Sequence, residues 1–319
     1  MAQLKALAVI GPTAAGKTKL AIALADRYNG EIISADSRQV YRGMDIGTGK
    51  DLPDYANNGR PIAHHLIDVA DPQQIFDLAT YQKMAQQALS DISQRQKLPI
   101  VAGGSGLYLQ ALIDNYQLSA VKPDNQRRQA LEELSAEQLY EQLLTAAPAL
   151  AQKLNNSDRH NPRRLIRYLE IATGATNQQP QSASAQPTTD WLILGIDYPM
   201  EVLEKRMYQR LIQRLENEDM IQEVHRLHEQ GLDWPRLESF GLEYRYISRY
   251  LREMIDYDQL VEQLHTAIRQ FAKRQKTWFK RWAKQGREIH WLNTDNPLKE
   301  AEELVKKLYK NFKKEIDIL

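Results

Sequence analysis

The chain has 319 residues, with 42 lysines and arginines against 41 acidic residues, a formal net charge of +1, and no cysteine. The absence of cysteine excludes a disulfide framework, a cysteine-ligated zinc site and a thiolate nucleophile, and it fits a reducing compartment. No run of about 18 apolar residues occurs, which excludes a membrane-spanning helix. The N-terminal apolar run is too short for a signal peptide, so we expect a cytoplasmic protein with no membrane partner.

The first third of the sequence alternates short apolar runs with longer amphipathic stretches. Residues 6–10, 31–35 and 99–102 are typical of strands, and residues 17–27 and 76–96 are typical of helices. Strands that alternate with helices form βαβ units. The sequence therefore predicts an α/β fold with a parallel sheet flanked by helices on both faces.

The middle of the chain has a different pattern. Residues 115–174 carry no strand signal and repeat leucine at helical spacing, and residues 175–190 are polar and interrupted by proline, as in a linker. Strand character returns at residues 191–196. We therefore predict a helical domain, residues 115–190, inserted into an α/β core formed by residues 1–114 and 191–319.

The loop after the first predicted strand carries a phosphate-binding motif. Its sequence, GPTAAGKT, satisfies G-x-x-x-x-G-K-[ST] and lies between a strand and a helix, as that motif requires. The glycines let backbone N–H groups converge at a helix N-terminus and form an anion nest. Lys17 supplies a charge to the outer phosphate, and the Thr18 hydroxyl is placed to bind Mg²⁺. The predicted phosphate-binding residues are Gly11, Pro12, Thr13, Ala14, Ala15, Gly16, Lys17 and Thr18. The loop leaves open whether the ligand is ATP, another nucleotide or a diphosphate.

Two other predicted strands end in polar residues. Asp36 follows one of them, and Gly-Gly-Ser-Gly at 103–106, with the Ser105 hydroxyl, follows another. Because the carboxyl ends of parallel strands share one edge of a sheet, both should face the crevice that holds the phosphate loop. Three roles remain open for Asp36, namely general base, Mg²⁺ ligand and N-cap. Ser105 either faces the crevice or caps the following helix.

Positive charge gathers at a predicted helix start. Arg159, Arg163, Arg164 and Arg167 fall within nine residues that contain no acid, and Asn161-Pro162 is typical of an N-cap and a first helical residue. Cations at a helix N-terminus oppose its dipole, so an anionic partner would stabilise the arrangement. The alternative is a solvated surface face.

A second basic region lies in the amphipathic helix predicted over residues 258–287, which precedes a strand candidate at 288–292. The predicted apolar side consists of Leu260, Leu264, Ile268, Phe271, Trp278 and Trp282. The predicted basic side, which would face a polyanion, consists of Arg269, Lys273, Lys276, Lys280, Lys284 and Arg287. A third ridge, formed by Arg206, Arg210 and Arg214, is spaced to reach a diphosphate or to pair with Glu204, Glu216 or Glu218.

Six sequence segments, taken in their order along the chain, form a recognisable set. They are GPTAAGKT at 11–18, SADSRQVYRGMDIGTGK at 34–50, HHLID at 64–68, GGSGLY at 103–108, NPRRLIRYLE at 161–170 and AKRQKTWFKRW at 272–282. Many phosphate-binding proteins share the first, whereas DSRQVY and AKRQ-TWF are far more specific. Together they resemble the tRNA dimethylallyltransferases, or tRNA isopentenyltransferases, over nearly the whole chain. Phe240-Gly241-Leu242 departs from the Ile-Gly-Tyr that this family commonly has, and the spacing around it differs.

The resemblance implies a P-loop NTPase-like core and a helical insertion that grips the anticodon stem-loop of tRNA. It implies transfer of a dimethylallyl group from dimethylallyl diphosphate to the exocyclic amine of the adenosine adjacent to the anticodon, with Mg²⁺ as cofactor and diphosphate as product. We expect a monomer. Asp36 matches the family's base, and Lys17, Thr18 and Ser105, which replaces the usual Thr, complete the implied catalytic set.

The resemblance also implies binding residues. Arg206 and Arg210 lie in the segment that supplies diphosphate-binding arginines. The implied tRNA-binding residues are Asp36, Ser37, Arg38, Gln39, Ser105, Arg128, Arg163, Arg164, Leu165, Ile166 and Arg167.

Three other functions remain possible on the sequence. A P-loop kinase of a nucleotide or small molecule shares the phosphate loop but would leave the basic 267–287 face unexplained. An adenylate isopentenyltransferase acting on free nucleotide would have less need of the arginines at 159–167. A GTPase-like RNA-binding switch is disfavoured because no obvious N-K-x-D guanine signature occurs.

Overall fold

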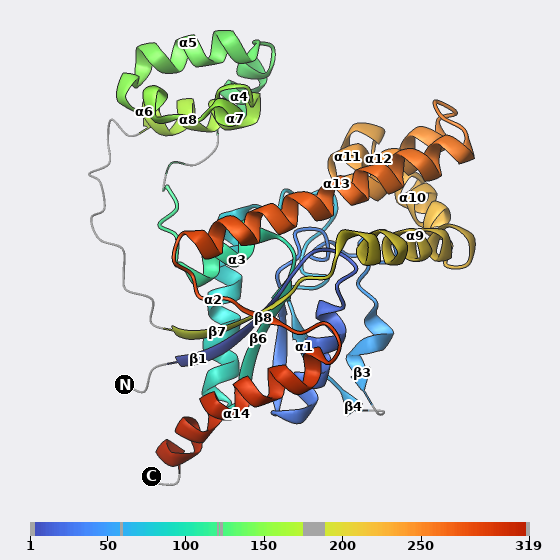
Figure 1. Ribbon diagram of the computed structural model, residues 1–319. Coiled ribbons are helices and arrows are strands. Elements are labelled where there is room, and N and C mark those ends of the chain that lie inside the picture. The colour runs from blue at the N-terminus through green and yellow to red at the C-terminus, as the bar shows by residue number, and fades with distance from the viewer. Residues whose placement is uncertain (1–3, 58–59, 120, 122–123, 175–188, 317–319) are drawn as a thin grey trace. The chain divides into compact units, whose positions relative to one another are not determined.

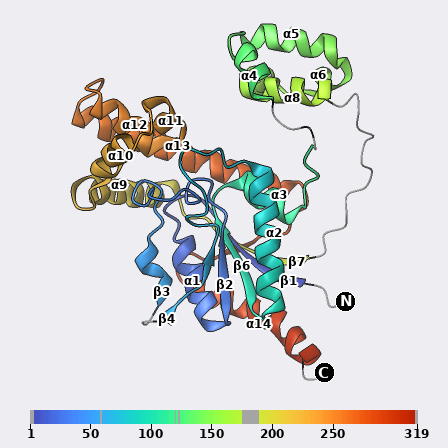
Figure 2. The same ribbon diagram turned by 180° about the vertical axis from the view of Figure 1, so that it is seen from behind.

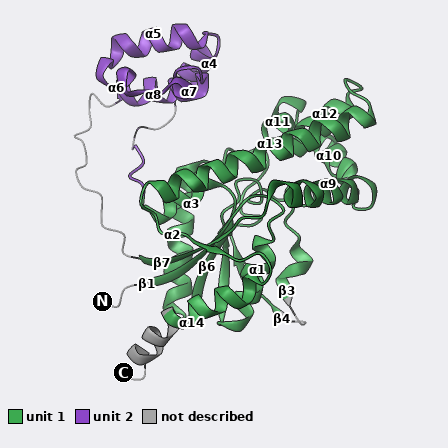
Figure 3. Ribbon diagram, viewed as in Figure 1, with its two compact units in different colours: residues 1–115, 186–319 green, residues 116–185 purple. Residues whose placement is uncertain are grey.

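The computed structural model describes residues 4–57, 60–119, 121, 124–174 and 189–316. The chain divides into two compact units, shown in Figure 3: unit 1 comprises residues 1–115 and 186–319, and unit 2 comprises residues 116–185. The predicted insertion began at residue 115 and ended at residue 190. Most of the predicted linker, residues 175–188, lies outside the described residues.

Unit 1 is built on a six-stranded parallel sheet with the order β5-β2-β6-β1-β7-β8 (Figure 1). Its strands are β1 (Leu4–Ile10), β2 (Gly30–Ser34), β5 (His64–His65), β6 (Leu98–Gly103), β7 (Thr189–Ile196) and β8 (His290–Leu292). Leu7 of β1 stands opposite Ile100 of β6 and Leu192 of β7. The predicted parallel sheet is therefore confirmed, with β1 and its loop at the centre. A separate antiparallel pair joins β3 (Ala56–Asn57) and β4 (Arg60–Pro61), next to the short helix η1 (Leu52–Tyr55).

Helices cover both faces of this sheet, as Figures 1 and 2 show from opposite sides. Successive side chains of a strand point to opposite faces, so Leu7 and Val9 of β1 join one buried cluster and Ala6 and Ala8 the other. The first cluster includes α1 (Lys17–Arg27) and α14 (Pro297–Ile316). The second includes α2 (Leu78–Gln94), α3 (Gly106–Ile113) and the end of α13 (Tyr257–Lys284).

The remaining helices of unit 1 pack together beside α13 (Figure 1). They are α9 (Met200–Glu216), α10 (Met220–Glu229), α11 (Trp234–Ser239) and α12 (Leu242–Leu251). The sequence predicted a helix over residues 258–287. The observed helix begins one residue earlier, because Asp256 and Gln259 form a capping box. No helix in the described part of the chain is long and apolar enough to span a membrane.

Unit 2 is helical throughout its described secondary structure, as its leucine spacing predicts. Its helices are α4 (Asn125–Glu132), α5 (Ala136–Ala146), α6 (Pro148–Lys153), α7 (Asn156–Arg159) and α8 (Pro162–Gly174). They enclose a small core of their own, which contains Leu139, Leu143, Leu165, Ile166 and Leu169. The predicted start of α8 is confirmed, since Pro162 is its first residue and the Asn161 side chain accepts from the Arg164 N–H at 3.2 Å.

Candidate active site

The carboxyl ends of three neighbouring strands bring the predicted site segments together. The GPTAAGKT loop follows β1, Asp36 follows β2 and Ser105 follows β6. A cavity of about 570 Å³ opens among them, and Thr13, Asp36 and Ser105 line it. This is the edge at which open α/β sheets bind ligands.

The phosphate loop has the geometry that its motif predicts. Gly16, with a φ of 83°, turns the chain into α1, which begins at Lys17. The Lys17 ammonium donates to the Pro12 carbonyl at 2.7 Å and so folds back over the loop. Burial lowers the pKa of Lys17 to about 8, with Arg210 adding to the decrease and Asp36 opposing it. A bound anion would reverse that decrease, because it stabilises the charged ammonium.

Asp36 caps the turn that follows β2 and also lines the cavity. Its Oδ1 atom accepts from the Arg38 backbone N–H at 2.9 Å, an Asx turn that fixes the carboxylate. The same side chain lines the cavity. Ser105 Oγ accepts from the Ser37 N–H at 3.1 Å, which ties the loop after β6 to the loop after β2. Asp36, Ser37, Arg38 and Ser105 therefore share one wall, as predicted.

Gln39 does not line that wall. Its Oε1 atom accepts from the Ser34 hydroxyl at 2.9 Å, and its Nε2 atom donates to the Gly49 carbonyl at 2.9 Å. Gln39 is buried, so both ends of its amide are occupied inside the protein. Gln39 is among the implied tRNA-binding residues, and its side chain does not reach the cavity. Gln39 supports the loop that carries Asp36.

Gln275, from the AKRQ segment of α13, joins the two glycine-rich loops. Its Oε1 atom accepts from the Thr13 N–H at 2.8 Å, and its Nε2 atom donates to the Gly104 carbonyl at 3.0 Å. A Cβ atom at Gly104 would lie 2.3 Å from Gln275 Nε2, so the contact requires glycine there. In the sequence the AKRQ segment is a family signature, and nothing in the pattern indicates this role of its glutamine.

The arginines of α9 divide into two groups. Arg210 donates to the Thr13 hydroxyl at 2.6 Å, and Arg214 is buried and pairs with Asp51 at 3.0 Å. Both line the cavity. Burial and the neighbouring Arg214 lower the pKa of Arg210 to about 10. Arg206 is exposed and lies over the Tyr198 ring at 4.0 Å. Of the two arginines implied to bind diphosphate, Arg210 lines the cavity and Arg206 does not, whereas Arg214 does.

A buried carboxylate, also missed in the sequence, holds the loop between Asp36 and Lys50. Glu223 of α10 accepts from the backbone N–H groups of residues 45, 46 and 47 at 2.8, 2.7 and 3.0 Å. It also accepts from the Tyr244 hydroxyl at 2.7 Å. Lys50 has a fully buried side chain and bonds to Asp45, Asp68 and the carbonyl of Tyr41. These contacts fix the part of the loop that lines the cavity.

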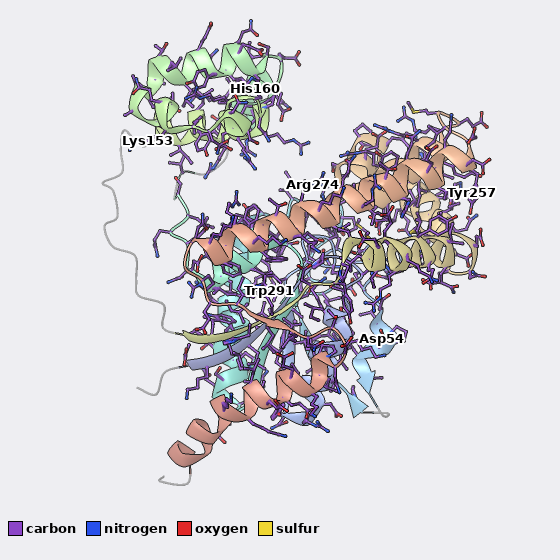
Figure 4. All side chains as sticks on the ribbon, viewed as in Figure 1. Asp54, Lys153, His160, Tyr257, Arg274 and Trp291 are labelled. Carbon is purple, nitrogen blue, oxygen red and sulfur yellow. The ribbon has the colours of Figure 1, made fainter. Side chains whose placement is uncertain are left out.

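The basic side of α13 differs from its prediction. Lys276 pairs with Asp197 at 2.6 Å, Arg269 with Glu204 at 3.3 Å, and Arg287 with Asp114. Three of the six cations are thus paired within the protein. Arg274, labelled in Figure 4 at the middle of α13, is not one of these six cations, and it lines the cavity. Phe271, predicted on the apolar side, is 37% exposed, because the buried side of α13 runs through Ala272 and Gln275.

In unit 2 the predicted tRNA-binding residues have different surroundings. Arg163 is exposed, and Arg164 pairs with Asp158. Arg128 and Arg167 both pair with the buried Glu170, at 2.6 and 3.0 Å. Burial alone would raise the pKa of Glu170, but hydrogen bonds from these arginines outweigh it and lower that pKa. Leu165 and Ile166 are buried in the core of unit 2, so their side chains face away from any partner.

Few protein groups are available to hold a metal ion near the phosphate loop. In the described part of the chain no three His, Cys, Asp or Glu side chains gather into a metal site. The Thr18 hydroxyl, at the start of α1, and the Asp36 carboxylate are oxygen donors of the type that Mg²⁺ uses. Mg²⁺ keeps several waters and usually takes its other ligands from substrate phosphates, so this sparse donor set fits it.

The family model described as IPP transferase matches residues 39–282. The tRNA dimethylallyltransferase 1 of Geotalea daltonii is 44% identical over 296 residues, which cover 92% of this chain and 93% of that protein. The chain belongs to the IPP transferase family. The tRNA dimethylallyltransferase 2 of Bacteroides fragilis is 42% identical over 307 residues, covering 96% of this chain and 98% of that protein.

The solved structures agree with this assignment to the IPP transferases. The tRNA isopentenylpyrophosphate transferase of Bacillus halodurans has a TM-score of 0.69 and 32% identity, covering 98% of this chain and 99% of that one. The fold is accordingly the P-loop NTPase-like fold of these enzymes. The residues matched by the family model include Arg210, Glu223 and Gln275, whereas the phosphate loop at 11–18 precedes them.

Proposed function

We propose that this chain transfers a dimethylallyl group from dimethylallyl diphosphate to the exocyclic amine of the adenosine adjacent to the anticodon of a tRNA. One observation carries the proposal: a single cavity is lined by Thr13 of the phosphate loop, two arginines of α9 and a fixed carboxylate. The names of the similar proteins agree with it.

The diphosphate of the donor binds at the phosphate-loop end. Backbone N–H groups of the loop, Lys17 and Arg210 supply donors, and Arg214 lies beside Arg210 on the next turn. When the allylic C–O bond breaks, its electron pair stays with the diphosphate, and these groups stabilise the added charge. In this proposal the loop promotes the departure of a diphosphate rather than the hydrolysis of ATP.

The acceptor adenine binds beside Asp36. The lone pair of its exocyclic amine is delocalised into the ring, so the amine is a poor nucleophile. A carboxylate that accepts a hydrogen bond from this amine takes one proton as the new N–C bond forms. The Asx turn and the Ser105–Ser37 hydrogen bond hold Asp36 ready for this transfer. A base within a stacked anticodon loop cannot enter the cavity, so the adenosine must be turned out of the loop first.

Thr18 would hold a Mg²⁺ ion together with oxygens of the diphosphate and water. The ion, when bound, neutralises charge that develops on the leaving diphosphate. The positive charges of Lys17 and of Arg210 in α9 also stabilise the leaving diphosphate. Hydrogen bonds to Pro12 and Thr13 of the loop hold these two side chains in place.

Unit 2 serves the tRNA. Arg163 is exposed at the start of α8, next to Arg164. A phosphate bound there would be stabilised by both the helix N-terminus and the arginines. Arg128 and Arg167 each retain one buried anionic partner, Glu170, and are 31% and 32% exposed.

The experiment is an incubation of the purified protein with dimethylallyl diphosphate, Mg²⁺ and unmodified tRNA, followed by nucleoside mass analysis. We expect a dimethylallyl adduct on one adenosine. Parallel reactions replace the tRNA with free AMP, or the donor with ATP. A product on AMP alone identifies an adenylate isopentenyltransferase, and phosphoryl transfer from ATP without any adduct identifies a kinase. Either result contradicts the proposal.

A further inference from the structure

A second carboxyl group, Glu243, lines the same cavity as Asp36. It lies in the first turn of α12, directly after the Phe240-Gly241-Leu242 segment that departs from the family pattern. Tyr244, its neighbour, is anchored by Glu223 at 2.7 Å, so this turn of α12 is held firmly against the loop at 45–47. Glu243 is thereby fixed at the cavity wall.

Glu243 is surrounded by cations without pairing to them. Arg214 pairs with Asp51 and Glu218, whereas no ion pair among the described residues involves Glu243. The charged side chains that line the cavity with it are Asp36, Arg38, Arg210, Arg214, Arg245 and Arg274. They come from the loop after β2, from α9, from α12 and from α13, and no histidine is among them.

Two opposing influences act on the Glu243 carboxyl. Burial raises its pKa and Asp36 adds to the increase, while a hydrogen bond from the backbone of Glu243, Arg214 and Arg210 oppose the increase and do not prevail. A diphosphate bound at Arg210 would bring negative charge to this end of the cavity. That charge offsets the influence of Arg214 and Arg210, which favours the carboxylate form. An ionised Glu243 would also repel the diphosphate and compete with it for the arginines.

We propose that Glu243 takes up a proton when a diphosphate binds at Arg210 and Arg214, and that its neutral carboxyl group donates a hydrogen bond to a diphosphate oxygen. The inference rests on the donor site given under Proposed function. In its neutral form Glu243 supplies a hydrogen-bond donor and adds no negative charge where negative charge develops on the leaving diphosphate. The group contacts the leaving diphosphate and leaves the adenine to Asp36.

The experiment is calorimetric titration of the whole chain with inorganic diphosphate in the presence of Mg²⁺. It is run in buffers of different ionisation enthalpy, at pH values from about 5 to about 9, so that heat reports proton uptake. The variants are Glu243→Gln, a neutral side chain of the same shape that can still donate, and Glu243→Met, which is neutral and cannot donate. Glu262→Gln, an exposed carboxylate elsewhere on α13, is the matched control.

Lys17 also takes up a proton on anion binding, since its pKa is about 8, but below about pH 7 it is already charged. Between pH 5 and 7 we therefore expect the wild type and Glu262→Gln to take up protons when diphosphate binds, and Glu243→Gln to take up none. Near pH 8 all three retain the uptake of Lys17. Ionisation of the free diphosphate is the same for every protein and cancels in the comparison.

Affinity gives a second readout. Glu243→Gln should match the wild type at pH 5 and bind diphosphate more tightly at pH 8, by about tenfold for each pH unit by which the ligand raises the pKa of Glu243. Glu243→Met should bind more weakly than Glu243→Gln at every pH. Equal proton uptake in wild type and Glu243→Gln, or weaker binding by Glu243→Gln at pH 8, overturns the inference. A wild type that binds no diphosphate at any pH overturns the donor site itself.

Discussion

Replacing Gln275 by alanine tests whether the amide of α13 holds the two glycine-rich loops in place. The change removes the acceptor of the Thr13 N–H and the donor to the Gly104 carbonyl, at 2.8 and 3.0 Å. Leaving a buried polar group unpaired costs about 1–3 kcal/mol. Because Gly104 is buried and Thr13 is half-buried, we expect the free energy of unfolding to fall by about 2–4 kcal/mol.

The loss should reach the chemistry as well. Thr13 carries the hydroxyl that receives the Arg210 hydrogen bond, so a shifted loop misplaces Arg210. We expect kcat/KM for dimethylallyl transfer to fall about tenfold to hundredfold in material that is still folded. The assay combines urea unfolding followed by circular dichroism with transfer rates measured well below the unfolding midpoint.

Gln270→Ala, an exposed glutamine on the same helix, is the control for the loss of a glutamine side chain. It should change the free energy of unfolding by less than about 0.5 kcal/mol. If Gln275→Ala and Gln270→Ala have the same stability and the same kcat/KM, the bridge between the loops has no function and the reasoning is refuted.

Three further predictions concern the base, the tRNA surface and the phosphate loop. Asp36→Asn should fold and bind tRNA normally but transfer about 10²–10⁴-fold more slowly, and a wild-type rate by nucleoside mass analysis would remove Asp36 as the base. Replacing Arg163 and Arg164 together by glutamine should weaken tRNA binding and reduce the slope of log K against log salt by about 1–2, measured by filter binding at several salt concentrations. An unchanged slope would contradict the role of unit 2 in binding tRNA. For Lys17, whose pKa of about 8 belongs to the free protein, the charged form binds the anion. Affinity for diphosphate should therefore decrease as the pH rises above about 8, and calorimetry should show no such decrease for Lys17→Met. If the decrease persists in Lys17→Met, a group other than Lys17 causes it.

The segments that the sequence predicted well are those whose structure depends on neighbours along the chain. The apolar run of β1, the GPTAAGKT loop and the start of α1 form one local unit, and its motif specifies its geometry. Unit 2 was likewise recognised as helical from its leucine spacing. The placement of Asp36 and Ser105 at one edge followed from the rule for parallel strands.

The sequence did not place polar side chains whose partners are distant along the chain. Gln39 and Gln275 both bury their amides, and no local pattern states which glutamine turns inward. Arg206, Arg210 and Arg214 have equal spacing along α9, so the choice among them depends on which turn meets Asp51 and Thr13. Glu223 accepts a hydrogen bond from the N–H of Gly47, which lies 176 residues away in the sequence, so no local motif could indicate this contact.

The most direct test of the account is a crystal structure with a non-cleavable analogue of dimethylallyl diphosphate and an anticodon stem-loop. We expect the diphosphate on the N–H groups of the GPTAAGKT loop, within reach of Arg210 and Arg214. The exocyclic amine of a turned-out adenine should lie about 2.6–3.2 Å from a carboxylate oxygen of Asp36. A diphosphate bound outside the loop, or an adenine amine that contacts another group while Asp36 faces solvent, would contradict the account.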